Sequence, residues 1–327
     1  MGPSNLNPEL VHICVVIPLY KAKGQIVDML KGIPACVRTI VVVDDCSPDE
    51  SFERASTVKD KKIHFVRHTQ NQGVGGAVLS GYQKAIELEA QIIVKMDSDG
   101  QMDPAYLPQL LAPIISGNAN YAKGNRFLHT TELKQMPFIR RLGNLGLSFM
   151  TKVATGYWNI FDPTNGYTAI DKYTLSRLDF NKISNRYFFE TSMLMELYNH
   201  RAVVKDVPIP ARYQGEKSSL STFKSFIEFS SKLWKGIFQR IGRQYFTSDF
   251  SAVSLFIFFG LLLFSFGLIW GIWHWVISIQ TQVAATTGTV MLAVVPFILG
   301  FQFLIQALVL DIGNVPTEVI DREHSPS

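Results

Sequence analysis

Two carboxylates and an amide follow an apolar run in the first third of the chain. Asp97, Asp99 and Gln101 come directly after Ile92–Met96, a run that predicts a buried strand. Carboxylates at positions i and i+2 beyond a strand can both reach one hard cation, and Mg²⁺ or Mn²⁺ favours such ligands while keeping coordination sites for a diphosphate. The pattern indicates chemistry on a nucleotide-activated substrate. A solvated turn is the alternative, because acidic pairs are common where loops begin.

The elements that would position these residues alternate between strand and helix over the first two-thirds of the chain. Strands are predicted at Val11–Ile17, Thr39–Val43, Ile63–Val66 and Ile92–Met96, with helices at Gln25–Lys31 and Ala77–Glu89. Near-continuous apolar strands separated by helices predict a parallel sheet covered on both faces, whose ligands bind at the carboxyl ends of the strands. Pro18–Tyr20, Asp44-Asp45 and Asp97–Gln101 should therefore meet in one site.

After Pro104, the regular alternation of predicted strands and helices ends. The sequence there predicts helices at Ala105–Ser116, Asn144–Val153 and Glu190–Tyr198, strands at Tyr121–Lys123 and Ala202–Val207, and a turn at Asp162–Gly166 that leads to an extended piece. Ser218–Gln244 has basic and aromatic residues at helical spacing, which predicts one or two amphipathic helices on a membrane surface. Packing of these helices on the domain core is the alternative, and both can hold.

A long uncharged stretch follows. Asp, Glu, Lys and Arg are absent between Asp249 and Asp311, although charged residues make up 18% of the 327-residue chain. This length suits two helices of about 20 residues with a short turn. We place the spans near Ala252–Ile279 and Thr289–Leu310, with Trp270, Trp273 and Trp275 as an interfacial belt. A helical hairpin in a protein core is the alternative.

Charge and cysteine usage predict the compartment. Lys232, Lys235, Arg240 and Arg243 precede the first span and the loop between the spans has no cation, so the positive-inside rule puts the N-terminal domain and both termini in the cytoplasm. Met1–Leu10 shows no cleavable signal. The three cysteines match no metal spacing and would be reduced core or loop residues. The net charge of the whole chain is a modest +4, and the basic residues gathered near the spans favour anionic lipid over nucleic acid.

Four motifs in order resemble family 2 glycosyltransferases of the GT-A fold. They are Val15–Tyr20, Val42–Asp49, Asn71–Ala77 and the D-x-D block Met96–Gln101. The resemblance covers about residues 11–215, and the two spans make the chain similar to bacterial polyprenyl-phosphate glycosyltransferases related to dolichyl-phosphate mannose synthase. It implies an α/β, Rossmann-like nucleotide-sugar domain with a mostly parallel sheet, followed by amphipathic interfacial helices and two transmembrane helices. The expected boundaries are 1–217, 218–248 and 249–327.

The resemblance implies roles on the donor side. The residues that would contact a UDP-hexose are Pro18, Tyr20, Asp44, Asp45, Asp97, Ser98 and Gln101. Asp97, Asp99 and Gln101 would hold Mg²⁺ or Mn²⁺ on the diphosphate, with Asp99 also counted as catalytic. Two alternatives stay open: a helix N-cap with Ser47 for the acidic pair at 44–45, and a tight strand-to-helix turn for Gly73–Gly76. Gly100 stands where the closest relatives often carry Leu, which leaves the subfamily open.

On the acceptor side, a polyprenyl phosphate is already an anion and needs cationic positioning more than a base. The residues that stand where the family places such cations are Arg126, Arg140, Arg212 and Lys217, with Arg141 leaving the register at Arg140 open by one. Asp162 occupies the family's catalytic-aspartate block. It would be a general base for a hydroxyl acceptor, an orienting residue for a phosphate acceptor, or a turn-forming Asp-Pro.

The hypothesis is therefore an inverting, metal-dependent transfer of a hexose, with glucose favoured, from a UDP-sugar to undecaprenyl phosphate on the cytoplasmic side of a bacterial inner membrane. One rival is an enzyme that glycosylates a lipid hydroxyl such as that of diacylglycerol. Another is a membrane-tethered nucleotide-sugar binding protein without turnover. The absence of a Q-x-x-R-W motif argues against a processive polymerase. The apolar stretch Phe223–Phe238 would also suit a contact between protomers, so a homo-oligomer is left open.

Overall fold

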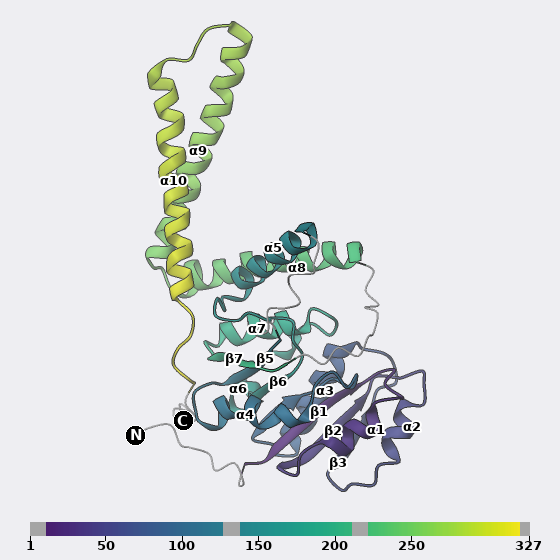
Figure 1. Cartoon of the computed structure of the whole chain (residues 1–327). Helices are drawn as coiled ribbons and strands as arrows, with labels where there is room; N and C mark the ends of the chain where they lie inside the picture. Colours follow the sequence, from purple (N-terminus) through teal and green to yellow (C-terminus); the bar gives the residue numbers. More distant parts are fainter. Residues whose placement is uncertain (1–10, 127–137, 211–221, 321–327) are drawn as a thin grey trace. The chain divides into compact units, whose positions relative to one another are not determined.

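The computed structural model describes residues 11–126, 138–210 and 222–320, with side chains for all of these except 138–144 and 222–227. Within them, seven strands form one sheet in the order β3-β2-β1-β4-β6-β5-β7 (Figure 1). Their bounds are β1 Ile13–Leu19, β2 Val37–Asp44, β3 Ile63–Arg67, β4 Ile92–Lys95, β5 Tyr121–Asn125, β6 Thr168–Asp171 and β7 Val204–Pro208. The pairs β1–β2, β1–β4, β2–β3 and β5–β7 are parallel, and β6 runs antiparallel to both β4 and β5.

The apolar runs form these strands because β-branched side chains suit a pleated surface covered on both sides. Every residue of β1 and β4 is buried. β1 extends beyond its predicted end at Ile17 to Leu19, through Pro18, which pairs with Val43 of β2. β4 has already ended at Lys95, which lies opposite Val16. The missing N–H of Pro18 therefore removes no ladder hydrogen bond on that side.

Two layers of helices cover the sheet. The helices of this part of the chain are α1 Ile26–Gly32, α2 Ser51–Ser56, α3 Val74–Glu87, η1 Pro104–Tyr106, α4 Leu107–Ile115, α5 Phe138–Thr155, α6 Lys172–Arg177, η3 Phe180–Lys182 and α7 Phe189–Asn199. One face packs Ile13, Val15 and Ile17 against α1 and α4 in a common apolar core. The other face lies under α3, where Gly81 allows close approach to Val16 and Val43. The predicted parallel α/β architecture is confirmed, with an antiparallel strand inserted.

The carboxyl ends of β1, β2, β4 and β5 all lie at one edge of the sheet. β1, β2 and β4 are parallel, and β5 runs in the same direction as β4 because both are antiparallel to β6. Chain segments that leave these strands therefore start from a single edge of the sheet, which is also where β6 begins after the turn at Asp162–Gly166. This edge collects the motifs that follow strands in the sequence.

α8 (Thr222–Gly242) begins within the predicted amphipathic stretch. Its Phe229 ring lies 4.9 Å from the Phe188 ring, Leu233 is fully buried, and Gly236 leaves room for Met195 of α7. Trp234, on another side of the helix, is 53% exposed. Packing on the domain core therefore holds for one face of α8, and an exposed aromatic residue remains on another.

Residues 237–315 form a second unit, separate from the unit made of residues 1–236 and 316–327. It contains the end of α8, the π-helical segment η4 (Arg243–Ser248), and the helices α9 (Ala252–Thr281) and α10 (Thr287–Gly313). Gly260, Gly267 and Gly300 allow the backbones of α9 and α10 to approach closely. The two predicted spans are present as helices, each slightly longer than expected.

A buried ion pair joins the two ends of this second unit. Arg240 donates to Asp311 of α10 through Nη1–Oδ1 and Nη2–Oδ2 contacts of 3.0 and 2.8 Å. The Tyr245 hydroxyl also donates to Asp311, and Ser254 Oγ donates to the carbonyl of Tyr245. The bidentate geometry compensates for burying both charges, because each carboxylate oxygen has a donor.

Candidate active site

The first two predicted clusters lie at the shared sheet edge. Leu19 pairs with Asp44 at the ends of β1 and β2, and the Asp45 N–H donates to the Leu19 carbonyl at 3.0 Å. Tyr20 is 44% exposed beside this edge, whereas Pro18 is buried in β1. The Tyr20 ring is thus exposed at this edge, with the Lys21 ammonium group 5.3 Å from its centroid, whereas Pro18 has little exposed surface to offer a ligand.

Asp44 and Asp45 are almost fully buried and hold loops together. Asp44 accepts a hydrogen bond from the Ser47 N–H and lies 3.1 Å from Nε of Arg67. Ser47 is therefore bonded to Asp44, but α2 begins only at Ser51, after an N-cap position at Glu50 without a side-chain cap. The alternative of a helix N-cap for the acidic pair accordingly does not describe this turn.

The Asp45 carboxylate organises the glycine-containing loop. Its two oxygens accept hydrogen bonds of 2.8 Å from the N–H groups of Gln72 and Gly73. His68 also reaches Asp45 through Nδ1 at 2.8 Å, and its Nε2 contacts Ser80 Oγ at 2.9 Å. The sequence interpretation missed His68, which links β3 to this loop. A histidine directly after a strand was the available signal.

The glycines at 73–76 are explained by close packing. Gly73 has φ of +91°, a conformation that favours glycine, and the backbone at Ser184 and Asn185 occupies the space that a side chain at Gly75 would need. The Gly76 N–H donates to the Asn185 carbonyl at 3.0 Å. This favours the tight-turn interpretation of the loop over direct contact with a phosphate.

The D-x-D block forms a tight turn beyond β4. Oδ1 of Asp99 accepts a hydrogen bond from the Gln101 N–H at 3.0 Å, and Gly100 takes a positive φ of +74° that favours glycine. Asp97, Asp99 and Gln101 are all partly exposed, whereas Ser98 is buried. Among the described residues, no group of three His, Cys, Asp or Glu side chains forms a metal site. Two carboxylates with an amide oxygen nevertheless fit Mg²⁺ or Mn²⁺ when a diphosphate supplies the remaining ligands.

A buried lysine lies directly behind this block. Lys95 is fully buried, and its Nζ lies 2.8 Å from Asp97 Oδ1 and 3.1 Å from Glu190 Oε1 of α7. Burial alone would lower the pKa of Lys95, but the two carboxylates raise it above the ordinary lysine value, so the side chain is charged. The sequence interpretation counted Lys95 as part of an apolar strand and overlooked Glu190. A lysine in an otherwise apolar run was the available signal.

Arg126 and Asp162 form a bidentate ion pair. Nε and Nη2 of Arg126 donate to Oδ2 and Oδ1 of Asp162 at 2.8 and 3.0 Å. Asp162 is fully buried, whereas the Arg126 side chain is 33% exposed. The Arg126 N–H also points to Asp162 Oδ2 at 3.3 Å. The buried Asp162 carboxylate therefore holds the guanidinium group of Arg126 in place while part of the Arg126 side chain stays exposed to solvent.

The turn at Asp162–Gly166 touches both halves of the site. At its start, Asp162 holds Arg126. At its end, Gly166 lies so close to Asp97 Oδ2 and Lys95 Nζ that a Cβ atom would overlap both. Between them, the Asn165 carbonyl accepts a hydrogen bond from the buried Lys123. Five consecutive residues thus connect the expected metal ligand with the expected acceptor arginine.

Lys123 was also absent from the sequence interpretation. It is fully buried in β5, and this burial lowers the pKa of its ammonium group to about 8 despite the carboxylates nearby. In contrast to Lys95, its hydrogen-bond partner at Asn165 is a neutral carbonyl. Of the remaining predicted cations, Arg140, Arg212 and Lys217 lie outside the residues whose side chains the structure describes.

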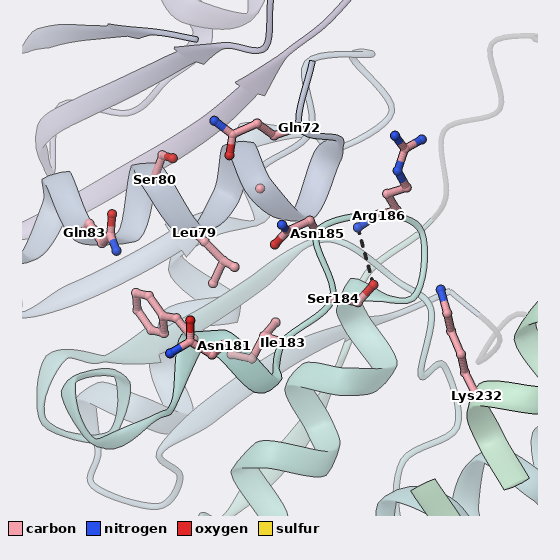
Figure 2. A pocket seen from close by; sticks show the side chains of 12 residues that line it. Gln72, Leu79, Ser80, Gln83, Asn181, Ile183, Ser184, Asn185, Arg186 and Lys232 are labelled. Carbon is pink, nitrogen blue, oxygen red and sulfur yellow. Dashed lines mark hydrogen bonds between the residues drawn. The ribbon is translucent and has the colours of Figure 1, made fainter. Parts of the chain in front are cut away.

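A separate cavity of about 550 Å³ opens beside α3. Figure 2 shows Leu79, Ser80 and Gln83 of α3, with Gln72 just before the helix, on one side of this cavity, and the segment that carries Asn181 and Asn185 on the other. Arg186 and Lys232 also line it. None of the described residues that were predicted for the site lines this cavity, although Ser80 connects it to Asp45 through His68.

Two helices of the second unit are long and apolar enough to cross a membrane. α9 and α10 have mean hydropathies of 2.5 and 2.2 over their most apolar windows, and most of these window residues are not buried within the protein. Exposed side chains include Phe258, Leu261 and Ile298. Apolar surface of this extent requires a non-aqueous partner, so these helices indicate membrane association.

The chain is similar to several known proteins. The family model described as glycosyl transferase family 2 matches residues 14–179, about half of the chain. A UDP-N-acetylglucosamine–dolichyl-phosphate N-acetylglucosaminyltransferase of Methanococcus voltae is 31% identical over 62% of this chain and 86% of its own length. A dolichol-phosphate mannosyltransferase of Pyrococcus furiosus is 26% identical over 71% of this chain and 66% of its own length. An undecaprenyl-phosphate mannosyltransferase of Micrococcus luteus is 30% identical over 52% and 70%, respectively.

The matched region contains β1 to β4, the D-x-D block and the turn that carries Asp162. These are the elements that build the shared edge of the sheet. The relatives are named for transfer of sugars to dolichyl or undecaprenyl phosphate, and their similarity extends over most of the first unit. On this architecture and these matches, the chain belongs to glycosyl transferase family 2.

Proposed function

We propose that this protein transfers a hexose from a UDP-sugar to a polyprenyl phosphate, undecaprenyl phosphate in particular, with inversion at the anomeric carbon. The observation that carries the proposal is the turn at Asp162–Gly166. It holds Arg126 at one end and packs against Asp97 at the other. A donor diphosphate at the D-x-D block and an anionic acceptor at Arg126 would thereby be held by one rigid segment.

The acceptor chemistry agrees with the Arg126–Asp162 pair. A phosphate monoester oxygen can attack the anomeric carbon without losing a proton, while the bond from that carbon to the diphosphate breaks and UDP leaves with the electron pair. Asp162 is fully buried and bonded to Arg126, which suits an orienting residue better than a base facing substrate. Arg126 has five N–H donors, so one guanidinium can hold a carboxylate and contact a phosphate together.

On the donor side, Tyr20, Asp44 and Asp45 would line the nucleotide pocket, and Asp97, Ser98, Asp99 and Gln101 would hold the sugar and diphosphate. A Mg²⁺ or Mn²⁺ ion bound by Asp97, Asp99 and Gln101 would offset the negative charge that develops on UDP. Arg140, Arg212 and Lys217 would complete the acceptor-phosphate site. We assign residues 1–217 to the catalytic domain, 218–248 to the juxtamembrane helices and 249–327 to the membrane hairpin with its tail.

The test uses full-length protein in nanodiscs, Mn²⁺, and labelled UDP-glucose, UDP-N-acetylglucosamine or GDP-mannose, each with undecaprenyl phosphate or diacylglycerol. We expect an acid-labile lipid-linked sugar from undecaprenyl phosphate with UDP-glucose, loss of product with EDTA, and a β-linkage from an α-linked donor. Product from diacylglycerol would support the lipid-hydroxyl rival. Absence of lipid-linked product with every donor and acceptor would overturn the proposal and favour a binding protein.

Two arginine variants test the proposed role of Arg126 in binding the acceptor phosphate. Arg126→Ala should raise the KM for undecaprenyl phosphate by at least tenfold, because a charge-assisted contact to phosphate is lost. Arg54 lies exposed on α2 and is not among the residues expected to bind donor or acceptor, so Arg54→Ala should leave KM within twofold. Equal effects of both variants would contradict the role of Arg126.

We also propose that the catalytic domain and both termini face the cytoplasm of a bacterial inner membrane. Cations precede α9, whereas the connection between α9 and α10 has none. In intact cells, a cysteine placed at the exposed Gln282 should react with a membrane-impermeant maleimide. The exposed native Cys36 should react only after the cells are permeabilised. The reverse labelling pattern would overturn this orientation.

A further inference from the structure

Lys95 occupies an unusual place for a lysine. It is the last residue of β4 and is fully buried, opposite Val16 of β1 and Thr168 of β6. Val16 contacts α3 at Gly81, so Lys95 faces the same helix-covered side of the sheet. A buried ammonium group is tolerated only when anionic partners surround it. Its partners are Asp97, two residues later, and Glu190 at the start of α7.

The ion pair restricts how Asp97 presents its carboxylate. Oδ1 of Asp97 has essentially no exposed surface and lies 2.8 Å from the Lys95 ammonium group. The Asp97 side chain as a whole is 28% exposed, so the open part of the group lies away from Oδ1. Gly166 packs against Oδ2 from one side, where a larger residue would overlap it. Rotation of the carboxylate is thus limited on two sides.

Glu190 is the second anionic partner of this lysine. Its Oε1 lies 3.1 Å from Lys95 Nζ, and its side chain is only 14% exposed. The neighbouring ring of Phe189 lies 6.0 Å from the same ammonium group. Because α7 supplies both groups, the position of Lys95 is set by the helix layer, and the position of Asp97 is set by Lys95.

From this geometry, we infer that Lys95, held by Glu190, is a positioning residue that turns Asp97 so that only Oδ2 is presented to the metal–diphosphate group. This inference rests on the proposed function, which assigns Asp97 as a metal ligand. A carboxylate with one oxygen bound to an ammonium group is restricted to a single-oxygen metal contact. Coordination positions are then left for Asp99 and for the diphosphate of the donor.

The test measures Mn²⁺ binding directly, by the electron paramagnetic resonance signal of free Mn²⁺, in full-length protein saturated with UDP and without lipid acceptor. Lys95→Met should raise the Kd for Mn²⁺ by tenfold or more, within the 10- to 100-fold range typical of residues that orient metal ligands. Lys152→Met is the matched control, since Lys152 is a half-buried lysine of α5 that donates to the Trp158 carbonyl. Its Kd should stay within twofold of wild type.

A second variant separates positioning from stability. Lys95→Met alone leaves the largely buried Glu190 and Asp97 Oδ1 without their shared cation, which can cause unfolding. The double variant Lys95→Met/Glu190→Leu removes the cation together with one anion and should recover thermal stability. We expect its Kd for Mn²⁺ to remain at least tenfold above wild type, because Asp97 Oδ1 is no longer held. Glu190→Gln keeps the Lys95–Asp97 contact and should change the Kd by less than threefold.

The outcomes distinguish the assignment of the metal ligands from the positioning role of Lys95. Wild-type protein that binds no Mn²⁺ in the presence of UDP would overturn the assignment of the metal ligands, and the role of Lys95 with it. Wild-type binding with an unchanged Kd in the double variant would overturn only the role of Lys95. Failure of both Lys95 variants to fold would also count against positioning, because it would assign Lys95 to stability alone.

Discussion

The guanidinium group of Arg126 and the carboxylate of Asp162 are joined by two hydrogen bonds of 2.8 and 3.0 Å. Asp162 is fully buried, and Arg126 is partly exposed at the end of β5. A carboxylate in this position is occupied by a cation before any substrate arrives. This contact supports the proposal that Asp162 orients Arg126.

Replacing Asp162 by Asn should separate this role from that of a general base. We expect Asp162→Asn to raise the KM for the polyprenyl phosphate about tenfold and to lower kcat by less than tenfold, since Arg126 loses the partner that aims it. The acidic limb of the pH–rate profile should be unchanged. A fall in kcat of about 100- to 10,000-fold together with loss of that limb would instead identify Asp162 as the base.

Lys123 should make stability depend on pH in the alkaline range. Its pKa is lowered from 10.5 to about 8 in the folded protein, so between these values the unfolded chain binds a proton that the folded chain does not. The free energy of unfolding should therefore rise with pH across this window, by about 3 kcal/mol at most. Thermal unfolding in detergent at pH 7.5 and 10 measures this change.

Lys123→Met is the control for that pH series, because it removes the titrating group and keeps a side chain of similar length. The melting temperature of this variant should rise less than that of wild type between the two pH values. Equal rises in both proteins would show that Lys123 does not titrate in this range.

In the second unit, the Arg240–Asp311 pair should be sensitive to removal of one partner. Asp311→Asn leaves the buried Arg240 without its counter-charge and should cost about 3–5 kcal/mol of unfolding free energy. The combined change Arg240→Met/Asp311→Leu/Tyr245→Phe removes all three polar partners and should recover at least half of this loss. Thermal unfolding in one detergent compares the two, and a combined variant as unstable as Asp311→Asn would contradict the explanation.

Two helical glycines should respond oppositely to alanine. Gly81 of α3 has no room for a Cβ beside Val16, so Gly81→Ala should destabilise the protein by about 1–3 kcal/mol. Gly146 of α5 has no atom within 4 Å of the added Cβ, and Gly146→Ala should be neutral or stabilising by up to about 1 kcal/mol. Melting temperatures that move in the same direction for both would show that α3 can shift away from the sheet.

Much of the architecture followed from local sequence patterns. Apolar β-branched runs predicted β1 to β4, and shorter patterns predicted β5 and β7, all to within a few residues. Burial on both faces explains the nearly continuous apolar side chains of β1, β2 and β4. The absence of charge between Asp249 and Asp311 predicted α9 and α10, because a membrane span has a required length. The D-x-D block could also be recognised in the sequence, because both of its carboxylates lie within one three-residue segment.

The pairing of distant residues depended on the tertiary structure. β6 was only an extended piece in the sequence, and its antiparallel insertion between β4 and β5 brings Arg126 to the edge that carries Asp97. Lys95 meets Glu190 from a position 95 residues away, and Asp162 meets Arg126 across 36 residues. Sheet register and helix placement decide which side chains share a buried face. No local pattern records that choice, so the sequence identified the groups and only the folded chain decided their partners.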